Sequence, residues 1–359
     1  MTIKTLTDIK SAHAKVRKEL DIIKVVSDDL GTPTKVTGND SLWCCPFHSE
    51  NSPSFGVHSQ MQIFKCFGCH RGGDVVSWTQ NLYGLTWPES IYLLAVKYGI
   101  DISAFERPPT EEEITKNRYI NICDQAAKFC CTALFHNKAL LDWYKSDTGF
   151  TAEQIVDHEV GWTQSTDTLI RHLFTIIPGL TQDDVDRLEF TNKLMWNNSL
   201  VYPIKDASGK TLRFYNKPLS PPPDFGGKYV GTSSRHPLFT HKLLYGFHLV
   251  RRDLRLNKYS IRVVEGQKAA IASSGVAMMG SALHEEQIRL LQEHQIKEVI
   301  IAFDGDAAGR AASVRLLDDV SLMDNMNVLV ARMPDDTQPD DLAKSKGLPA
   351  LTKIFKDAI

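Results

Sequence analysis

Hydrophobic residues in the first third of the chain recur with helical spacing on both sides of a short, cysteine-rich segment. The spacing predicts a helix over residues 9–23 before this segment and two further helices over residues 74–82 and 87–98 after it. These helices enclose the cysteines in the sequence. We therefore expect residues 1–105 to form one small domain around them.

A domain boundary is predicted after this unit. Residues 106–113 have the proline and charge density of a linker, and helical periodicity resumes over residues 114–144. Two short strand-like runs at residues 200–206 and 211–216 then flank a turn of small and polar residues, which is the signature of a β-hairpin. These patterns predict a mixed α+β subdomain over residues 114–258.

The last hundred residues alternate apolar runs with helical patterns. The runs that end before Glu265 and near residues 276–279 and 299–303 have the character of buried strands of a parallel sheet. Residues 259–359 are therefore expected to form an α/β domain. The whole chain is predicted to be multidomain, with α+β parts leading into this α/β domain.

Composition narrows the class of protein. The 359 residues carry 41 Lys and Arg against 43 Asp and Glu, and 42% are hydrophobic, which excludes a disordered or fibrous chain. No apolar run is long enough to span a membrane and no signal peptide begins the chain, so a soluble protein of the cytoplasm is expected. The net charge of −2 gives no overall attraction to nucleic acid, so such binding would depend on local basic patches.

The grouped cysteines indicate a metal site. Cys45 and His48 are separated by two residues, as are Cys66 and Cys69. Each pair fits a tight turn, and a Cys3His set without an open position is typical of structural Zn²⁺. Cys44 is an alternative to Cys45, but adjacent strand residues point to opposite faces, so only one of the two can face the ion, and we prefer Cys45. The sequence therefore predicts an N-terminal zinc ribbon with helices.

Aromatic and basic residues surround these ligands and allow two interpretations. They could stack bases and meet phosphates of a single strand, or the rings could simply form the small core of the ribbon. The sequence leaves both open. The residues are Trp43, Phe47, Phe55, Phe64, Lys65, Phe67, His70 and Arg71.

Carboxylates follow two of the predicted strands in the C-terminal domain. Glu265 ends one apolar run, and Asp304 ends another, with Asp306 two residues later across a glycine. Asp340 belongs to a third acidic stretch. Because the carboxyl ends of parallel strands share one edge of the sheet, Glu265 and Asp304 are expected to converge. Hard oxygen ligands suit Mg²⁺ or Mn²⁺ with substrate phosphates as further ligands, which predicts phosphoryl-transfer chemistry.

A simpler interpretation exists for the pair of aspartates. Asp304 and Asp306 could be a strand-end and a cap of the helix that begins near Ala307, where acidic residues are favoured. The third carboxylate, Glu265, favours the metal site because it follows a separate strand. Gly280 lies in a small-residue turn before a predicted helix and could approach a phosphate.

Taken together, these motifs resemble the bacterial DnaG-type DNA primases over nearly the whole chain. The zinc-ribbon motifs come first, the middle segments are similar to the family's RNA polymerase core, and the acidic motifs are similar to its Toprim domain. The matching segments begin at Cys45-Pro-Phe-His, Phe64-Lys-Cys-Phe-Gly-Cys, Tyr202-Pro-Ile-Lys-Asp, Arg213-Phe-Tyr-Asn-Lys, Lys228-Tyr-Val, His241-Lys-Leu-Leu-Tyr-Gly-Phe, Val264-Glu-Gly and Phe303-Asp-Gly-Asp-Ala-Ala-Gly-Arg.

The resemblance implies roles for individual residues. Divalent metal, Mg²⁺ or Mn²⁺, would be bound by the Toprim acids Glu265, Asp304, Asp306 and Asp340. Nucleotide or template phosphates would be contacted by Lys217, Lys228, Lys242, Gly280 and Arg310. The family's last acidic motif usually has two aspartates around a proline, whereas this chain has Gln338 at the first position. A second metal would then be held less tightly, or with help from Asp335 or Asp336.

The activity implied by the resemblance is primer synthesis from ribonucleoside triphosphates on a single-stranded DNA template by two-metal nucleotidyl transfer. The chain ends soon after the Toprim motifs, so a replicative helicase partner, if there is one, would be a separate chain. Two rival classes are a Toprim nuclease or topoisomerase, and a template-binding or origin-binding factor whose acidic site has decayed. A topoisomerase also needs a tyrosine in a strand-passage domain, for which the chain has no room.

Overall fold

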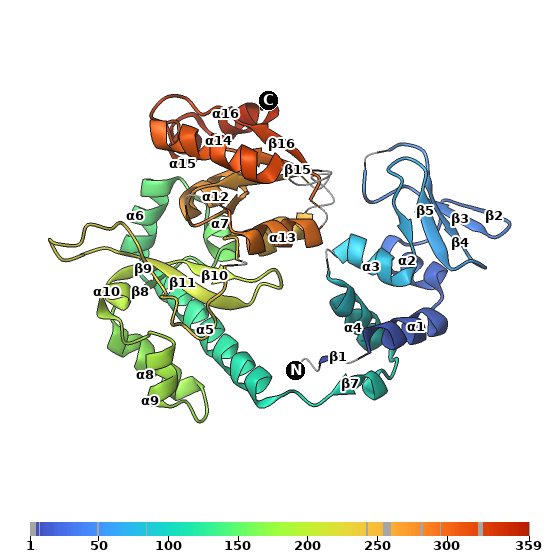
Figure 1. The fold of residues 1–359 in the computed structure, drawn as a ribbon, viewed down its shortest axis with the longest axis horizontal. Helices are drawn as coiled ribbons and strands as arrows, with labels where there is room; N and C mark the ends of the chain where they lie inside the picture. The colour runs from blue at the N-terminus through green and yellow to red at the C-terminus, as the bar shows by residue number, and fades with distance from the viewer. Residues whose placement is uncertain are drawn as a thin grey trace. The chain divides into compact units, whose positions relative to one another are not determined.

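The computed structural model describes residues 5–6, 8–48, 50–83, 85–241, 243–253, 260–280, 283–294, 296–321 and 326–358 (Figure 1). They form two compact units. The first runs to Glu111, and the second comprises Glu112–Arg251 and Ser260–Ile359. Within these described ranges no helix combines the length and the apolar character needed to cross a membrane.

The first unit is built on an antiparallel sheet in the order β2-β3-β4-β5-β6. Its strands are β2 (Lys35–Thr37), β3 (Asp40–Trp43), β4 (Phe55–His58), β5 (Ile63–Cys66) and β6 (Gly72–Gly73). Around it lie α1 (Ile9–Glu19), α2 (Ile22–Leu30), α3 (Val75–Tyr83), α4 (Trp87–Tyr98) and the short helix η1 (Ser103–Phe105). A separate two-stranded ribbon joins β1 (Thr5–Leu6) to β7 (Glu106–Arg107). The predicted helices over residues 74–82 and 87–98 are therefore present as α3 and α4.

The single helix predicted over residues 9–23 is wrong, because two helices occupy this stretch. Leu20 has extended backbone angles and ends α1, and the Asp21 side chain accepts a 2.9 Å hydrogen bond from the Ile23 N–H at the start of α2. An aspartate at this position competes for the backbone donors that would otherwise continue a helix. The apolar spacing hides the break because Ile22, Val25 and Val26 continue it.

The middle part of the second unit contains an antiparallel sheet flanked by helices. Its strands follow the order β10-β11-β9-β8, with β12 paired to β11. They are β8 (Gly161–Thr163), β9 (Ser199–Val201), β10 (Pro203–Lys205), β11 (Thr211–Pro218) and β12 (Val230–Gly231). The helices are α5 (Glu111–His136), α6 (Lys138–Thr148), α7 (Ala152–Asp157), α8 (Thr166–Ile176), α9 (Gln182–Arg187), α10 (Lys193–Trp196) and α11 (Phe247–Asp253). The predicted hairpin is confirmed as β10 and β11.

The C-terminal part of this unit is a four-stranded parallel sheet in the order β14-β13-β15-β16. Its strands are β13 (Ser260–Val264), β14 (Val276–Ala277), β15 (Glu298–Ile301) and β16 (Asn327–Val330). The connecting and following helices are α12 (Gln267–Ser273), α13 (Glu285–Glu293), α14 (Ala307–Ser321), α15 (Pro339–Lys346) and α16 (Leu348–Lys356), drawn in orange to red in Figure 1. The predicted α/β fold with a parallel sheet is confirmed.

One hydrophobic core runs through both parts of the second unit. It includes Tyr144 of α6, Tyr202 between β9 and β10, Val264 of β13 and Ala270 of α12. A backbone bridge between Tyr245 and Ala277 also joins the middle part to the edge strand β14. The shared core fixes the middle elements against the parallel sheet, and this determines which side chains meet at the sheet edge.

The domain limits drawn from the sequence, at residues 105, 113 and 258, remain predictions. The segment expected to be a linker contains β7, which pairs with β1 in the first unit, and the start of α5 at Glu111. The long helical pattern over residues 114–144 is interrupted at Asn137, whose side chain caps α6 by accepting from the Leu140 N–H at 3.2 Å.

Candidate functional site

Four predicted ligands of the ribbon come together at the end of the antiparallel sheet. The ligand atoms of Cys45, His48, Cys66 and Cys69 all lie within 4.8 Å of one another. The Sγ atoms of Cys45 and Cys69 are 3.8 Å apart, which is the separation of roughly 3.8 Å expected for two thiolates about 2.3 Å from one tetrahedral ion. This donor set fits a structural Zn²⁺ with no open position.

The choice between the two adjacent cysteines is settled by their burial. Cys45 is buried and faces the other ligands, whereas Cys44 is exposed. Of the two, the structure therefore brings Cys45 to the other three predicted ligands.

Glu50 is a residue of this centre whose role was not predicted. Its carboxylate lies 3.0 Å from His48 Nε2 and also accepts hydrogen bonds from the Cys45 N–H at 2.6 Å and the Ser54 N–H at 3.1 Å. Because Nε2 is engaged by Glu50, Nδ1 of His48 is the nitrogen free to bind the ion, and it lies 3.9 Å from Cys66 Sγ. The sequence signal for this role was the position of Glu50, five residues after Cys45.

The structure decides the two interpretations of the surrounding aromatic residues. Trp43, Phe47, Phe55 and Phe64 are buried. The rings of Phe47, Phe55 and Phe64 pack around Trp78 of α3 with centroids 5.0 to 5.7 Å from it, so these rings form the core of the ribbon. Phe67 differs, because its side chain is 71% exposed on the turn between Cys66 and Cys69.

The predicted acidic residues gather at the carboxyl edge of the parallel sheet. Glu265 follows β13, Asp304 follows β15 and Asp340 lies in the first turn of α15, after β16. The Asp304 N–H donates to Glu265 Oε1 at 3.3 Å, which joins the two strand ends directly. Glu265, Asp304 and Asp340 are half-buried, whereas Asp306 is exposed.

The electrostatics of this edge fit a cation. Burial raises the pKa of the Asp304 carboxyl to about 7, and the negative charges of Glu265 and Asp340 act in the same direction. Burial likewise raises the pKa of Glu265 and of Asp340. Several half-buried carboxylates that repel one another are stabilised by a divalent ion, so the residues present fit Mg²⁺ or Mn²⁺.

Asp306 also serves the simpler role considered above. Its Oδ1 accepts a 2.7 Å hydrogen bond from the Gly309 N–H, so it caps the start of α14. One carboxylate oxygen remains for another partner. Its assignment as a metal ligand therefore stays a prediction.

The stretch around Gln338 arranges its polar groups in a specific way. Gln338 Nε2 donates to Asp304 Oδ2 at 2.8 Å. Asp335, considered as a substitute ligand, instead pairs with Arg310, with Nη1 and Oδ1 3.1 Å apart on the surface. Asp336 is exposed and has a left-handed backbone with φ of 53°.

Two glycines allow close backbone packing around Asp304. A Cβ on Gly305 would lie 1.9 Å from the Pro334 carbonyl oxygen, and one on Gly309 would lie 2.2 Å from that of Asp304. The Gly305 N–H donates to the main-chain oxygen of Thr337 at 2.9 Å, so the turn after β15 is joined directly to the loop before α15. A side chain at Gly305 would push the loop carrying Gln338 and Asp340 away from Asp304, and one at Gly309 would push the start of α14 away from the Asp304 backbone.

The residues predicted to contact phosphates differ in how exposed they are. Lys217 on β11 is half-buried, and Lys228 is exposed. The positive charge of Lys228 opposes the rise in the pKa of Asp304 that burial causes. Burial lowers the pKa of Lys217, and the charge of Lys228 acts in the same direction. Lys242 lies outside the described residues. Gly280 directly follows Met279, whose N–H donates to the main-chain oxygen of Glu265 at 3.3 Å.

Lys268 and Asp147 are further charged residues of this region that sequence reasoning missed. Lys268 lies in the first turn of α12, and its Nζ is 2.9 Å from Asp147 Oδ2. Lys268 stands three residues after Glu265, which was a usable signal. No local pattern connects it to Asp147, which lies 121 residues earlier.

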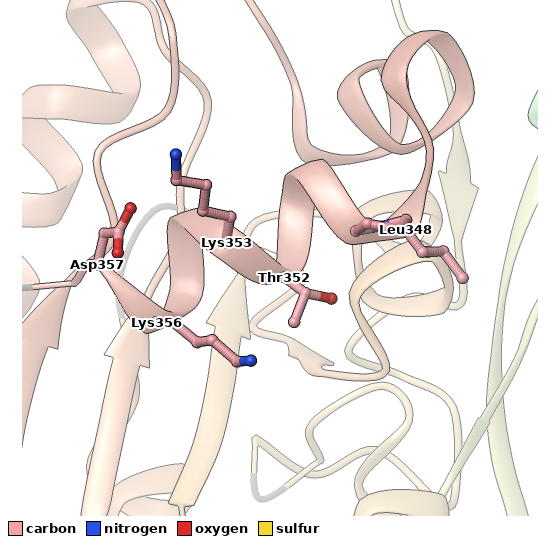
Figure 2. A pocket seen from close by; sticks show the side chains of 6 residues that line it. Leu348, Thr352, Lys353, Lys356 and Asp357 are labelled. Carbon is pink, nitrogen blue, oxygen red and sulfur yellow. The ribbon is translucent and has the colours of Figure 1, made fainter.

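A separate hollow lies along α16 and contains none of these acids (Figure 2). Its lining residues are Leu348, Pro349, Thr352, Lys353, Lys356 and Asp357. It lacks convergent carboxylates, and we assign it no part in the chemistry of the sheet edge.

Two family models match the chain. Residues 9–108 match the CHC2 zinc finger, and residues 260–343 match the family described as Toprim-like. Both matches fall on the motifs described above. Each covers one end of the chain and leaves the middle α+β part outside it.

Individual proteins extend the similarity across the middle part. A DNA primase of Halalkalibacterium halodurans is 30% identical over 357 residues, which cover 93% of this chain and 57% of the relative. This chain thus spans less than two thirds of that protein's length.

Solved structures agree. The Aquifex aeolicus primase, with its zinc-binding and RNA polymerase domains, aligns with a TM-score of 0.58 and 25% identity over 99% of this chain and 86% of that one. The RNA polymerase domain of Mycobacterium tuberculosis primase DnaG, solved with double-stranded DNA, aligns with a TM-score of 0.58 and 25% identity over 67% of this chain and 81% of that one.

Proposed function

The chain is a homologue of the DnaG-type DNA primases, with their CHC2 zinc finger and Toprim-like domain, and we propose that it is itself a primase. In this proposal it synthesises short RNA primers on single-stranded DNA from ribonucleoside triphosphates. The observation that carries the proposal is the convergence of Glu265, Asp304 and Asp340 at one sheet edge of a chain that also carries the zinc ribbon. In this proposal the protein acts in the cytoplasm, where these substrates are found.

Glu265, Asp304, Asp306 and Asp340 would hold the divalent metal. When bound, Mg²⁺ or Mn²⁺ neutralises triphosphate charge and favours the ionised primer 3′-hydroxyl. The protein's part is to keep the carboxylates in place. The Asp304 N–H bonded to Glu265 and the Gln338 amide bonded to Asp304 both serve this purpose.

The number of metal-binding carboxylates is one fewer than in the family pattern, because Gln338 stands where the first aspartate of the last motif is usual. The Arg310–Asp335 pair is exposed and leaves little reason to assign Asp335 to the metal. We propose that the metal at this edge depends mainly on the half-buried acids, Glu265, Asp304 and Asp340. Asp306, already engaged as a helix cap, would contribute through its remaining oxygen.

Lys217 and Lys228 would contact nucleotide or template phosphates, together with Lys242, Gly280 and Arg310. Support comes from Lys228, whose charge acts on Asp304 and Asp340, and from Lys217, whose charge acts on Asp147. Arg310 is held at this edge by the Gly305 carbonyl oxygen at 2.5 Å and by Asp335. Because the net charge is near zero, such local cations would provide most of the attraction to DNA.

The zinc ribbon would engage the template. Its exposed Phe67, beside the exposed Lys65 of β5, offers one ring for stacking on an unpaired base. The remaining aromatic residues are committed to the core. A helicase partner supplied as a separate chain remains part of the proposal, and no surface is assigned to it.

A single assay distinguishes this proposal from its rivals. The protein is incubated with single-stranded DNA, ribonucleotides and Mg²⁺ or Mn²⁺, and a DNA polymerase with labelled deoxynucleotides is then added. A primase yields labelled strands that begin with RNA. A nuclease shortens the template, and a binding factor leaves the template intact and unextended. Either of these last two results would overturn the proposal.

A further inference from the structure

Lys268 is a largely buried cation next to the acidic edge. It is the second residue of α12, and only 17% of its side chain is exposed. A lysine is rarely buried to this degree without a specific partner, because its charge is costly to remove from water. The partner is Asp147 on α6, 2.9 Å away, whose side chain is 37% exposed.

Asp147 joins two helices of the Toprim-like domain to the middle subdomain. Its carboxylate binds Lys268 of α12, and its main-chain oxygen accepts a 2.7 Å hydrogen bond from Lys344 of α15. Burial would raise the pKa of the Asp147 carboxyl, but the hydrogen bond and charge of Lys268 lower it below its usual value. The pair therefore fixes the Lys268 ammonium at a point from which its charge acts on Asp340 of the acidic edge.

Three lysines influence one another or the acids at this point. Burial lowers the pKa of Lys217, and the neighbouring charge of Lys268 lowers it further. Lys268 and Lys228 both lower the pKa of Asp340. Across the described parts of the chain, neither Lys217 nor Lys228 has a hydrogen-bonded partner for its ammonium group. Lys217 and Lys268 both act on Asp147, a carboxylate that is not among the proposed metal ligands, while Lys228 acts on Asp304 and Asp340.

A polyanion that also meets a divalent ion would satisfy this arrangement. A triphosphate carries several charged oxygens, some for the metal at the acids and others for ammonium groups nearby. An ammonium group already held in place loses less conformational freedom on binding than a free surface lysine.

We propose that Lys268 binds the triphosphate of the incoming nucleotide, with Asp147 as the residue that positions it. This inference rests on the proposed function for the identity of the nucleotide. Lys268 belongs to none of the sequence motifs, and it is too buried to be part of a basic surface patch. The competing explanation is that the Asp147–Lys268 pair only fastens α6 to α12.

Lys344→Met is a matched control, because Lys344 also reaches Asp147 but through the main-chain oxygen and from an exposed position. Binding of ATP, and of adenosine as the phosphate-free probe, is measured with Mg²⁺ by equilibrium titration. We expect Lys268→Met to weaken ATP binding about 10-fold or more without changing adenosine binding, and Lys268→Arg to restore part of it. Lys344→Met should change neither by more than about twofold.

Asp147→Asn and the double variant Asp147→Asn/Lys268→Met guard against a folding defect, because the double variant leaves no unpaired charge. The double variant should have a thermal midpoint at least as high as that of Asp147→Asn, which leaves Lys268 unpaired, yet bind ATP as weakly as Lys268→Met. The inference is overturned if Lys268→Met leaves ATP binding unchanged, or if it weakens adenosine binding as much as ATP binding.

Primer synthesis by the same proteins separates this inference from the proposed function. A wild-type protein that makes primers while Lys268→Met keeps the wild-type KM for ribonucleotides contradicts the inference alone. A wild-type protein that binds ATP through Lys268 but makes no primers contradicts the proposed function alone.

Discussion

The side-chain amide of Gln338 donates a 2.8 Å hydrogen bond to Oδ2 of Asp304. Gln338 is the N-cap residue of α15, yet its side chain makes no capping bond, because it is turned toward the acidic edge instead. An amide here stabilises the carboxylate without adding a negative charge to a group of acids that already repel one another. Gln338 is therefore a positioning residue for Asp304.

Replacing Gln338 by Leu should lower kcat for primer synthesis about 10-fold, since a hydrogen bond to a charged group contributes about 1.5–3 kcal/mol. Gln338→Asp should retain activity but need a higher Mg²⁺ concentration, because the added charge repels Asp304 until a cation is bound. Metal titrations of steady-state rates measure both effects, with exposed Gln292→Leu as the control. Unchanged rates and metal dependence in both variants would show that the hydrogen bond has no such role.

Asp304→Asn should stabilise the metal-free protein at neutral pH while abolishing synthesis. The folded pKa of Asp304, about 7, lies above its ordinary value of 3.8, so the wild type loses stability as pH rises from about 4 through 7. The variant should therefore have a thermal midpoint a few degrees higher at pH 8, and about the same midpoint at pH 4.

The control for this measurement is Asp335→Asn, whose side chain is 91% exposed. It should show no such difference between pH 4 and pH 8. If Asp304→Asn also gave the same midpoint as the wild type at both pH values in the presence of a chelator, the raised pKa would be refuted.

Glu50→Gln should lower zinc affinity about 10- to 100-fold, the usual effect of removing a partner that orients a histidine ligand. The amide of glutamine can still accept from backbone N–H groups, but one of its two positions can no longer accept from His48 Nε2. Competition with a chromogenic chelator measures the affinity, and Glu19→Gln on α1 is the control. Equal zinc affinities of the two variants would contradict the role assigned to Glu50.

Gly305→Ala should abolish synthesis and leave zinc binding intact. Its Cβ would lie 1.9 Å from the Pro334 oxygen, so the loop carrying Gln338 and Asp340 must move. Gly266→Ala is the matched control, because a Cβ there meets nothing within 4 Å and its φ is −121°. Comparable activity of the two variants would show that the contact between the loops is dispensable.

DNA binding should be weak and strongly dependent on salt. Removing one phosphate contact reduces the slope of log K against log salt by about 0.7 for a single strand. Lys228→Met should show this reduction, whereas Lys353→Met on α16, in the hollow of Figure 2, should not. Fluorescence anisotropy with a labelled oligonucleotide across a salt series provides the slopes. A wild-type affinity independent of salt would refute electrostatic binding.

The elements that could be predicted from the sequence are those specified by local pattern. The Cys3His spacing identified all four ligands, and the alternation of neighbouring residues was enough to choose Cys45 over Cys44. The apolar runs before Glu265 and Asp304 located two adjacent parallel strands. In each case the required information lies within a few residues.

The features that were missed depend on backbone competition or on distant contacts. Asp21 and Asn137 interrupt helices whose apolar spacing continues without a break, because each captures a backbone N–H as a cap. The partnership of Lys268 with Asp147 joins helices far apart in the chain. The bond from Gln338 to Asp304 likewise requires the two loops to be packed, which no local pattern reports.

The central claim is that the acids at the sheet edge support templated synthesis of RNA. The most direct measurement is incorporation of labelled ribonucleotides on single-stranded DNA of defined sequence, with Mg²⁺ or Mn²⁺, by the wild type and Asp304→Asn. The account predicts short products of complementary sequence from the wild type, and none from a variant that still binds the DNA. Products that persist in Asp304→Asn, or their absence from a wild type that binds DNA under every metal condition, would contradict it.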